Sequence, residues 1–386
     1  MKTTTLKTAE KATESINATV TIKNNESTGI TSTTLLVGLD WGTNTSSLMA
    51  KSQGDAAVRL SEQIPTVVGF VPENVLEGII PNNATVLFGR EAQKYKLHVN
   101  TVRPLKGGVI DDLSAASLFA QHLRSRLPAG VKEVRAVIGM PASSDLAARE
   151  NARTAVQGVF NKVIFVPEPF LAALGFRDET RLSEVEYKDP VLNSLYVDIG
   201  AGSTDVCLVQ GHYPTVEDQL SAPFAGDAVD QIILDGILAN YPDCGVTLAR
   251  VRELKEKFSF VLADDAATPA VATVMVAGKP VKLDVTRQVG AGCQALLDKA
   301  FEMTRELITR ADPDSVNELL QNVIVTGGGS LIKGFGVALQ TRLLEEGFEN
   351  VRVSVLGENY KDYVARGALK VAGQAKDRHW QTLIGG

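Results

Sequence analysis

The chain has few of the residues that build covalent or metal-held frameworks. Its 386 residues include only three cysteines and four histidines. Cys207, Cys244 and Cys293 are widely separated, and the histidines show no ligand spacing. Neither a disulfide framework nor a zinc site is therefore expected. We expect reduced thiols and a cytoplasmic protein.

Long apolar runs and blocks of basic residues are also missing. No run is long enough to cross a bilayer. Residues 1–33 are rich in Thr, Lys, Glu, Asn and Ser and lack the apolar core of a secretory signal. This composition predicts a disordered N-terminal tail without direct membrane insertion. The net charge is −6, and no basic block is interleaved with aromatics, so direct nucleic-acid binding is not expected.

The sequence does contain enough apolar residues for a large core. Hydrophobic residues make up 44% of the chain and charged residues 22%. At this length, such a composition predicts a protein of two domains.

One short motif occurs twice. The segments LDWGTNT (39–45) and VDIGAGST (197–204) each follow an apolar, β-rich run and precede a second strand-like run. This pattern predicts two hairpins with glycine and hydroxyl residues at their tips. Glycine, consecutive amides and hydroxyls suit a bound phosphate, so two facing phosphate loops are expected. Asp40 and Asp198 would repel a phosphate unless a cation lay between them, which favours Mg²⁺ bound largely through water.

A third glycine loop, VTGGGS (325–330), follows another buried strand-like run. An isolated triple glycine is as often a flexible turn as a ligand loop. Here it follows two aspartate–glycine hairpins, and the three loops together indicate a ligand loop rather than a flexible turn.

Between these loops, strands and helices alternate, which predicts an α/β architecture with mixed sheets. The expected domain I is 34–178, with a small subdomain at about 65–98. Domain II is 179–344, with a small subdomain at about 228–288, and 345–386 returns to domain I. The spacing of apolar residues along the chain predicts helices at 115–127, 145–160, 229–241, 251–262 and 363–375. It predicts strands at 134–139 and 163–166, a hairpin at 272–285 and a loop at 179–190.

The order of the three loops resembles the phosphate-1, phosphate-2 and adenosine motifs of the actin, Hsp70 and sugar-kinase ATPase superfamily. The resemblance covers most of the chain from residue 35 onward and is greatest to bacterial actins, in particular those of magnetosome-associated filaments. Subfamily likeness rests on four segments: 104–110, 216–219, 251–261 and 278–286. The implied fold has two similar domains around a nucleotide cleft, each a mixed β-sheet flanked by helices with a smaller inserted subdomain.

The resemblance also implies roles for individual residues. Glu168 and Asp198 would be catalytic, with Glu168 positioning or activating the attacking water, and Asp40 and Asp198 would hold Mg²⁺ through water. Alternatively, Glu168 is a solvated turn residue and the aspartates serve turn chemistry. Asp205 either joins this cluster or pairs with a backbone amide. The residues expected to hold ATP or ADP are Gly42, Thr43, Asn44, Thr45, Gly200, Ala201, Gly202, Ser203, Thr204, Lys255, Glu256, Gly327, Gly328, Gly329 and Ser330.

Two of these positions have competing interpretations. Lys255 and Glu256 would contact adenine and ribose, yet a Lys-Glu-Lys run is most often a solvated helix face. Trp41 fills space under the first loop and receives no catalytic role. Eukaryotic actin has a lysine shortly after this loop, where the chain has Ser46 and Ser47.

The implied function is a cytoskeletal ATPase that polymerises with Mg-ATP and disassembles after hydrolysis, positioning organelles or other cargo. The expected partners are further copies of the chain, through residues 64–94 and domain II of the next subunit, and adaptor proteins. A plasmid-segregating or shape-related actin would carry the same site. An Hsp70-type chaperone is disfavoured because no substrate-binding domain follows, and a small-molecule kinase because no separate catalytic aspartate is apparent.

Overall fold

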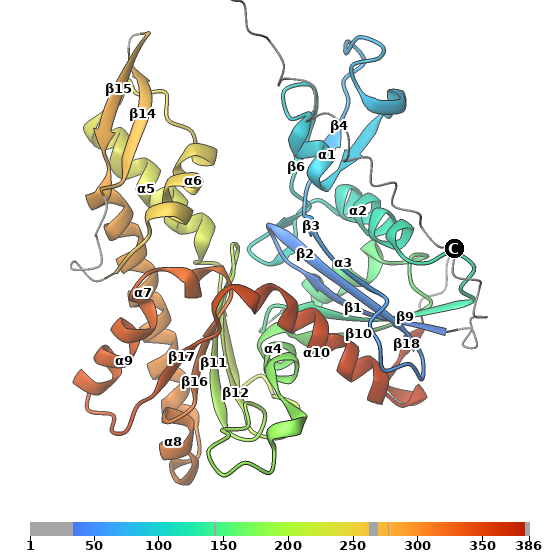
Figure 1. Cartoon of the computed structure of the whole chain (residues 1–386), viewed down its shortest axis with the longest axis vertical. Helices are drawn as coiled ribbons and strands as arrows, with labels where there is room; N and C mark the ends of the chain where they lie inside the picture. The colour runs from blue at the N-terminus through green and yellow to red at the C-terminus, as the bar shows by residue number, and fades with distance from the viewer. Residues whose placement is uncertain (1–33, 143, 262–268, 277, 383–386) are drawn as a thin grey trace, which may run out of the picture. The chain divides into compact units, whose positions relative to one another are not determined.

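The computed structural model describes residues 34–142, 144–261, 269–276 and 278–382. The predicted tail at 1–33 lies outside this part of the chain. The fold contains two main sheets with helices packed on both, as Figure 1 shows. The fold class expected from the sequence is confirmed.

The first sheet has six strands in the order β18-β10-β9-β1-β2-β3. β1, β2 and β3 form an antiparallel meander, while β9 and β10 continue from β1 in parallel. Parallel strands need crossovers, and α2 and α3 provide length for the connections before and after β9. The bounds are β1 Thr34–Trp41, β2 Thr45–Ser52, β3 Leu60–Pro65, β9 Glu133–Met140, β10 Lys162–Pro167, β18 Gln381–Thr382, α2 Leu113–Arg126 and α3 Leu146–Ala155.

The second sheet repeats the same plan with five strands, in the order β13-β12-β11-β16-β17. β11, β12 and β13 are antiparallel, and β16 and β17 continue from β11 in parallel. The bounds are β11 Ser194–Ile199, β12 Thr204–Val209, β13 Gln219–Ala222, β16 Val323–Thr326, β17 Val353–Val355, α5 Gly226–Asn240, α6 Leu248–Phe258, α7 Thr286–Arg310, α8 Pro313–Leu320 and α9 Phe335–Glu345.

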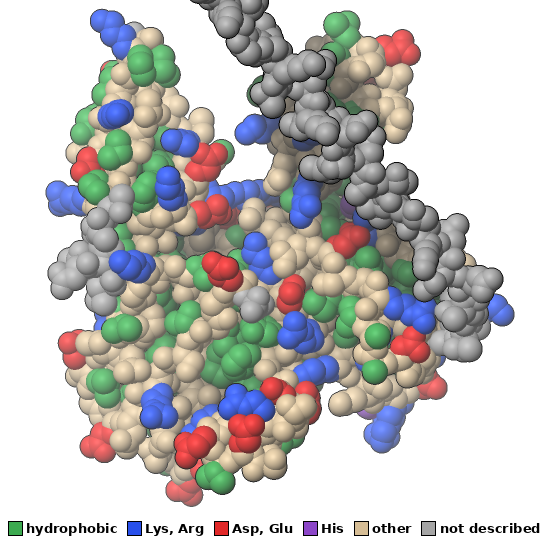
Figure 2. Space-filling model, in the orientation of Figure 1, with side chains coloured by type: hydrophobic (Ala, Val, Ile, Leu, Met, Phe, Trp, Pro, Cys, Tyr) green, Lys and Arg blue, Asp and Glu red, His purple; other side chains and the backbone are tan. Residues whose placement is uncertain are grey.

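Smaller elements extend from each sheet. A three-stranded sheet, ordered β5-β4-β6, has its own apolar cluster, and two hairpins complete the set. The bounds are β4 Val68–Phe70, β5 Val86–Phe88, α1 Gly89–Lys94, β6 Asn100–Val102, β7 Leu105–Lys106, β8 Val109–Ile110, β14 Val271–Val276 and β15 Lys279–Asp284. On the face shown in Figure 2, acidic and basic side chains are interspersed.

Two helices lie between the main sheets: α4 (Glu168–Phe176) and α10 (Tyr360–Gln374). They share one apolar cluster with Leu36 and Val137 of the first sheet and with Tyr196 and Ile324 of the second. Figure 1 shows α10 beside α4 at this junction. Their burial against both sheets makes them the structural link between the two halves.

The backbones of α4 and α10 touch because glycine occupies the contact points. A Cβ on Gly175 of α4 would overlap the carbonyl oxygen of Tyr363. A Cβ on Gly367 of α10 would likewise overlap the carbonyl oxygen of Leu171. These contacts leave no room for any side chain at either glycine.

The structure differs from the sequence predictions at several boundaries. The helix expected at 145–160 ends at Ala155, and Gly158 follows with a φ of 74°. The helix expected at 251–262 is α6, which begins at Leu248 and ends at Phe258, where Ser259 turns to an extended conformation; residue 262 is outside the described part. β17 pairs with the second sheet, so assigning all of 345–386 to domain I is wrong for this strand. β17 has only three residues, too few for the hydrophobic pattern of the sequence to indicate which sheet the strand joins. The remaining domain boundaries stay a prediction.

Along the described chain, no helix combines the length and the hydropathy that crossing a membrane requires.

Replacing Gly367 with alanine tests the helix contact. We expect Gly367→Ala to lower the free energy of unfolding by about 1–3 kcal/mol or more, because overpacking forces backbone shifts. The measurement is urea denaturation followed by circular dichroism. Gly373→Ala, in the same helix, is the matched control. The nearest atom to its Cβ would be Lys51 Nζ at 3.7 Å, so stability should hold or rise by up to about 1 kcal/mol. Equal urea midpoints for Gly367→Ala and Gly373→Ala would contradict the close backbone contact at Gly367.

Candidate functional site

A cavity of about 420 Å³ lies where the three glycine loops meet. This volume is in the range of small-molecule sites. The predicted residues that line it are Asp40, Gly42, Thr43, Asn44, Thr45, Glu168, Asp198, Gly200, Ala201, Gly202, Ser203, Lys255, Glu256, Gly327, Gly328 and Gly329.

Two predicted binding residues do not line the cavity. The Thr204 hydroxyl donates to the carbonyl oxygen of Phe224 at 2.7 Å. The Ser330 hydroxyl donates to the carbonyl oxygen of Gly327, also at 2.7 Å. Both side chains are buried and hold loop backbone rather than face the cavity.

The first two loops are hairpin tips, as the repeated motif predicts. Trp41 pairs with Ser46 at the end of the β1–β2 ladder, and Ile199 pairs with Thr204 at the end of the β11–β12 ladder. Within the second tip, the amide of Gly200 donates to the carbonyl of Ser203 at 2.9 Å. Equivalent residues of the two tips line one cavity, and the tips touch there, since a Cβ on Gly202 would lie 2.5 Å from Thr43 Oγ1.

A third hairpin, β7–β8, reaches the same place with its tip. The amide of Gly108 donates to Thr43 Oγ1 of the first loop at 3.0 Å. A Cβ on Gly202 of the second loop would lie 2.7 Å from that same amide nitrogen. The β7–β8 tip therefore contacts both hairpin loops, and Gly108 itself lines the cavity.

The third loop requires glycine at its first position. Gly327 has a φ of 77°, in the left-handed region that favours glycine. A Cβ there would overlap the carbonyl oxygen of Ile199 and lie 2.5 Å from Asp198 Oδ1. The loop backbone thus lies directly against the second aspartate motif.

Three carboxyl groups of the predicted catalytic and metal-binding residues line the cavity, and a fourth, that of Asp205, lies close enough to act on two of them. Glu168, the first residue of α4, and Asp40 and Asp198 on the central strands are half-buried, while Asp205 is buried. Burial raises the pKa of Asp40 to about 7. Burial, with the charges of Asp205 and Asp40, raises the pKa of Asp198 to about 8.

The other two carboxyl groups differ in their partners. Burial, followed by the charges of Asp40, Asp205 and Asp198, raises the pKa of Glu168 well above its usual range. Burial also raises the pKa of Asp205, although hydrogen bonds oppose the shift. Asp205 accepts from the Ala142 amide at 2.8 Å and from the Ser203 hydroxyl at 2.7 Å. It therefore both joins the cluster and pairs with a backbone amide.

The carboxyl cluster fits a hydrated divalent cation. Within the described parts of the chain, Asp40, Glu168 and Asp198 form no ion pair. No group of three His, Cys, Asp or Glu side chains in the same parts is close enough to hold a metal directly. Mg²⁺ retains several waters and needs only one or two carboxylates, so this spacing suits it. Mutual repulsion among the carboxylates would fall on binding a cation.

Lys255 is tied to its own domain rather than solvated. Its Nζ lies 2.7 Å from Asp230 Oδ1 and donates to the carbonyl of Gly226 at 2.6 Å. Arg252 shares Asp230, with Nε 2.8 Å from Oδ2. Asp230 is fully buried, so these two cations compensate a buried charge. The solvated-face interpretation fits Lys257, which is exposed, but not Lys255.

Several cavity residues were not predicted from the sequence. Most of them come from elements that tertiary packing brings to the loops. Ser47, Gly108 and Arg252 lie in segments already noted in the sequence, but no local motif marks them as cavity residues. A Cβ on Gly328 would lie 3.4 Å from the Tyr360 hydroxyl, at the start of α10. Ser47 donates its hydroxyl to the carbonyl of the neighbouring Lys361 at 2.7 Å. The unpredicted lining residues include Ser47, Gly108, Asp227, Arg252, Leu296, Ile332, Tyr360 and Lys361.

Comparison with known proteins places this architecture in one family. Residues 32–379 match the model of the MreB/Mbl protein family. The actin-like protein MamK of Paramagnetospirillum magneticum is 31% identical over 358 residues, covering 90% of this chain and 95% of that protein.

Solved structures of MamK give the same result. A MamK double helical filament superposes with a TM-score of 0.78 at 28% identity, covering 89% of this chain and all (100%) of that chain. A non-polymerising MamK mutant bound to AMPPNP superposes with a TM-score of 0.61 at 29% identity, covering 88% and 98%. The chain therefore belongs to the MreB/Mbl family of actin-like proteins.

Proposed function

We propose that this protein is a cytoskeletal ATPase that binds Mg-ATP in the loop-lined cavity, polymerises into filaments and disassembles after hydrolysis to ADP and phosphate. The observation that carries the proposal is the convergence of three glycine loops and the carboxyl groups of Asp40, Glu168 and Asp198 on one cavity in a family member. The MamK structure with AMPPNP supports nucleotide as the ligand.

Different residues of the cavity would bind the phosphates, hold the cation and orient the attacking water. The amides and hydroxyls of the two hairpin tips would bind phosphate oxygens, and Asp40 and Asp198 would hold Mg²⁺ through water. When bound, the cation would neutralise charge on the phosphates. Glu168 would orient a water molecule, and it accepts that water's proton when ionised. Burial and the neighbouring carboxylates raise the pKa of Glu168 in the unliganded chain, and a bound cation would lower it toward the ionised form that accepts the proton.

Self-assembly is supported by the MamK filament and by exposed apolar side chains in the small three-stranded subdomain. Leu76 is 76% exposed and Leu97 is 88% exposed, and both line a shallow pocket there. We infer that this subdomain contacts domain II of the next subunit. A head-to-tail contact of this kind repeats without closing and yields a filament. The proposed setting is the cytoplasm, with adaptor proteins linking filaments to organelles. Plasmid or cell-shape cargo is the alternative.

Glu168→Ala separates binding from hydrolysis. We expect Mg-ATP affinity to stay within about threefold while phosphate release falls by roughly 10²- to 10⁴-fold, because the water loses its base. Filaments should then persist longer. Isothermal titration and a phosphate-release assay measure the two quantities. Glu150→Ala, at an exposed position on α3, is the matched control and should behave like the unmodified chain. Unchanged phosphate release in Glu168→Ala would exclude the role, and lost binding would make Glu168 structural.

The carboxyl cluster predicts how stability depends on pH without nucleotide or metal. Asp40 and Asp198 hold protons in the folded state up to pH of about 7 and about 8, whereas the unfolded chain releases them above 3.8. Unfolding therefore releases protons, and the free energy of unfolding falls as pH rises from about 4 to about 8. Asp198→Asn should flatten this decline, and Mg²⁺ should oppose it in the unmodified chain.

Urea denaturation in chelator at several pH values measures this dependence. Asp243→Asn, on an exposed loop, is the control and should leave the decline intact. An identical pH profile for Asp198→Asn would show that the Asp198 carboxyl does not carry the raised pKa.

Sedimentation with Mg-ATP tests assembly. The full chain should pellet above a threshold concentration, and Leu97→Asp should remain in the supernatant while still binding Mg-ATP. Deleting residues 2–30 should leave pelleting intact, since that segment offers little apolar surface to bury. Failure of the full chain to pellet at any practical concentration would reject the filament proposal. A pellet lost only on deletion would assign the tail to the interface.

A further inference from the structure

The chain passes between the two main sheets at two places that lie against each other. One passage is the crossover segment, residues 177–193, which joins α4 to β11. The other runs from β17 of the second sheet through a short 3₁₀ turn, Gly357–Asn359, into α10. α10 packs against α4, so both passages share one helix pair.

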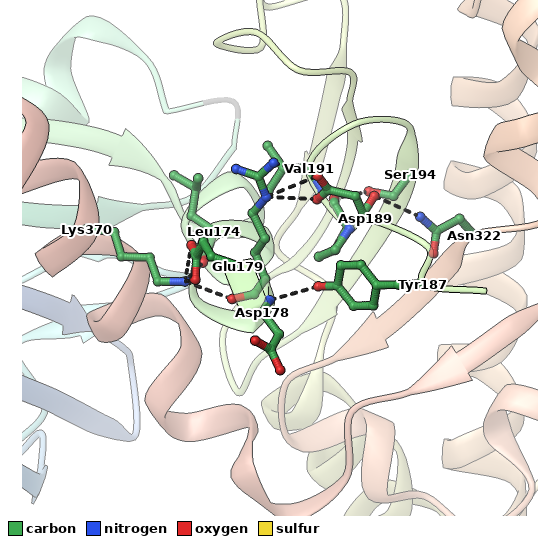
Figure 3. Close-up of polar contacts among 11 residues, drawn as sticks. Leu174, Asp178, Glu179, Tyr187, Asp189, Val191, Ser194, Asn322 and Lys370 are labelled. Carbon is green, nitrogen blue, oxygen red and sulfur yellow. Dashed lines mark hydrogen bonds and ion pairs between the residues drawn. The ribbon is translucent and has the colours of Figure 1, made fainter. Parts of the chain in front are cut away.

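Lys370 of α10 joins these two passages. Its Nζ donates to the carbonyl oxygens of Leu174 and Arg177, each at 2.8 Å. It also lies 2.8 Å from Glu179 Oε1. Figure 3 shows the Lys370 ammonium beside Leu174 and Glu179. A cation at the last carbonyls of a helix satisfies acceptors that have no partner within the helix. Lys370 therefore closes the C-terminal end of α4 and fastens it to the crossover segment.

The polar contacts continue through the crossover segment to the second sheet. Arg177 binds the Asp189 carboxylate through two nitrogens, the shorter contact being 2.6 Å. The Asp178 amide donates to the Tyr187 hydroxyl at 2.8 Å. Asn322, just before β16, donates to the Asp189 and Asn193 carbonyls at 3.4 and 3.1 Å. Figure 3 shows this connected series from Lys370 to Asn322.

α4 connects this cluster to the candidate active site. Glu168 is its first residue, and the helix is nine residues long, a span of about 13 Å. The glycine contacts at Gly175 and Gly367 hold its backbone against α10. A short helix held in this way moves as one body, so a shift at its C-terminal end also shifts Glu168.

We propose that Lys370 is a positioning residue for ATP hydrolysis, through the clamp formed by its ammonium, the Leu174 and Arg177 carbonyls and Glu179. The clamp makes the two passages move together and keeps Glu168 in place at the cavity. This role rests on the proposed ATPase function. The apolar packing of α4 and α10 does not depend on the ammonium, so loss of the clamp loosens the junction without unfolding it.

The test compares Lys370→Met with the unmodified full chain. Methionine keeps an apolar stem and removes the charge. We expect kcat to fall about tenfold with KM for Mg-ATP nearly unchanged, because misplacing a reacting group costs rate rather than binding. Amide hydrogen exchange of residues 177–193 should become faster, and exchange in α7 should not change. Lys370→Arg should recover most of the rate, since the guanidinium can reach the same acceptors.

Lys162→Met is the matched control. Lys162 pairs with Glu133 at 3.4 Å and is 25% exposed, against 27% for Lys370, but it lies on β10 of the first sheet. In Lys162→Met, kcat and the amide hydrogen exchange of residues 177–193 should equal those of the unmodified chain.

Each of the other outcomes contradicts a different step of the proposal. Faster exchange with unchanged kcat would leave Lys370 a structural cap without a positioning role. Unchanged exchange would show that the clamp does not hold the crossover segment. A comparable fall in kcat for Lys162→Met would trace the effect to general loss of stability. An unmodified chain that hydrolyses no ATP would reject the proposed function and the positioning role together, while the exchange data would still decide whether the clamp exists.

Discussion

The backbone contact between α4 and α10 is the constraint on which the rest of the structure depends. Gly175 and Gly367 allow two helices to approach so closely that no side chain fits between them. The pair then buries its outer faces against both sheets in one apolar cluster. Because the same pair carries Glu168 at one end and contacts the cavity through Tyr360, its packing determines where the chemical groups lie.

The carboxyl cluster opposes this packing, because its acidic groups are costly to hold close together. Four acidic groups share a small region, and burial raises the pKa of each. Repulsion by neighbouring carboxylates adds to the shift at Glu168 and Asp198. Such an arrangement is unfavourable in the unliganded chain, and the proposed cation would relieve it. The rigid helix pair and the hairpin ladders hold the acidic groups together despite their repulsion. Stability has thus been given up locally for ligand binding.

Much of the fold was predictable because its signals are local. The hairpins carrying Asp40 and Asp198 follow from glycine and hydroxyl residues that lie between two strand-like runs close in the sequence. The α/β class follows in the same way. Lys255, predicted to contact the nucleotide, does line the cavity, and that contact stays a prediction. Its pairing with buried Asp230 was not foreseen, since the two lie on different helices.

Other parts of the site depend on contacts between distant segments. Gly108 and Tyr360 reach the cavity only through tertiary packing. Gly108 lies in a segment that carries the family likeness, but nothing local marks either residue as part of the site. The partner of β17 is set by the second sheet's edge and not by its own three residues. Thr204 and Ser330 were predicted to bind ligand because they belong to the motifs, whereas their hydroxyls stabilise the loops. The loop motifs therefore do not distinguish residues that contact a ligand from those that support the loop.

The small sheet formed by β4, β5 and β6 has a separate apolar cluster of Val67, Ile80, Leu87, Ala92 and Val99. None of these five residues belongs to the cluster that joins the main sheets or to the cavity wall. Its surface is therefore free to diverge during evolution without disturbing the catalytic geometry. A duplicated copy of this protein could acquire new assembly partners through this module alone, while its nucleotide chemistry stayed unchanged.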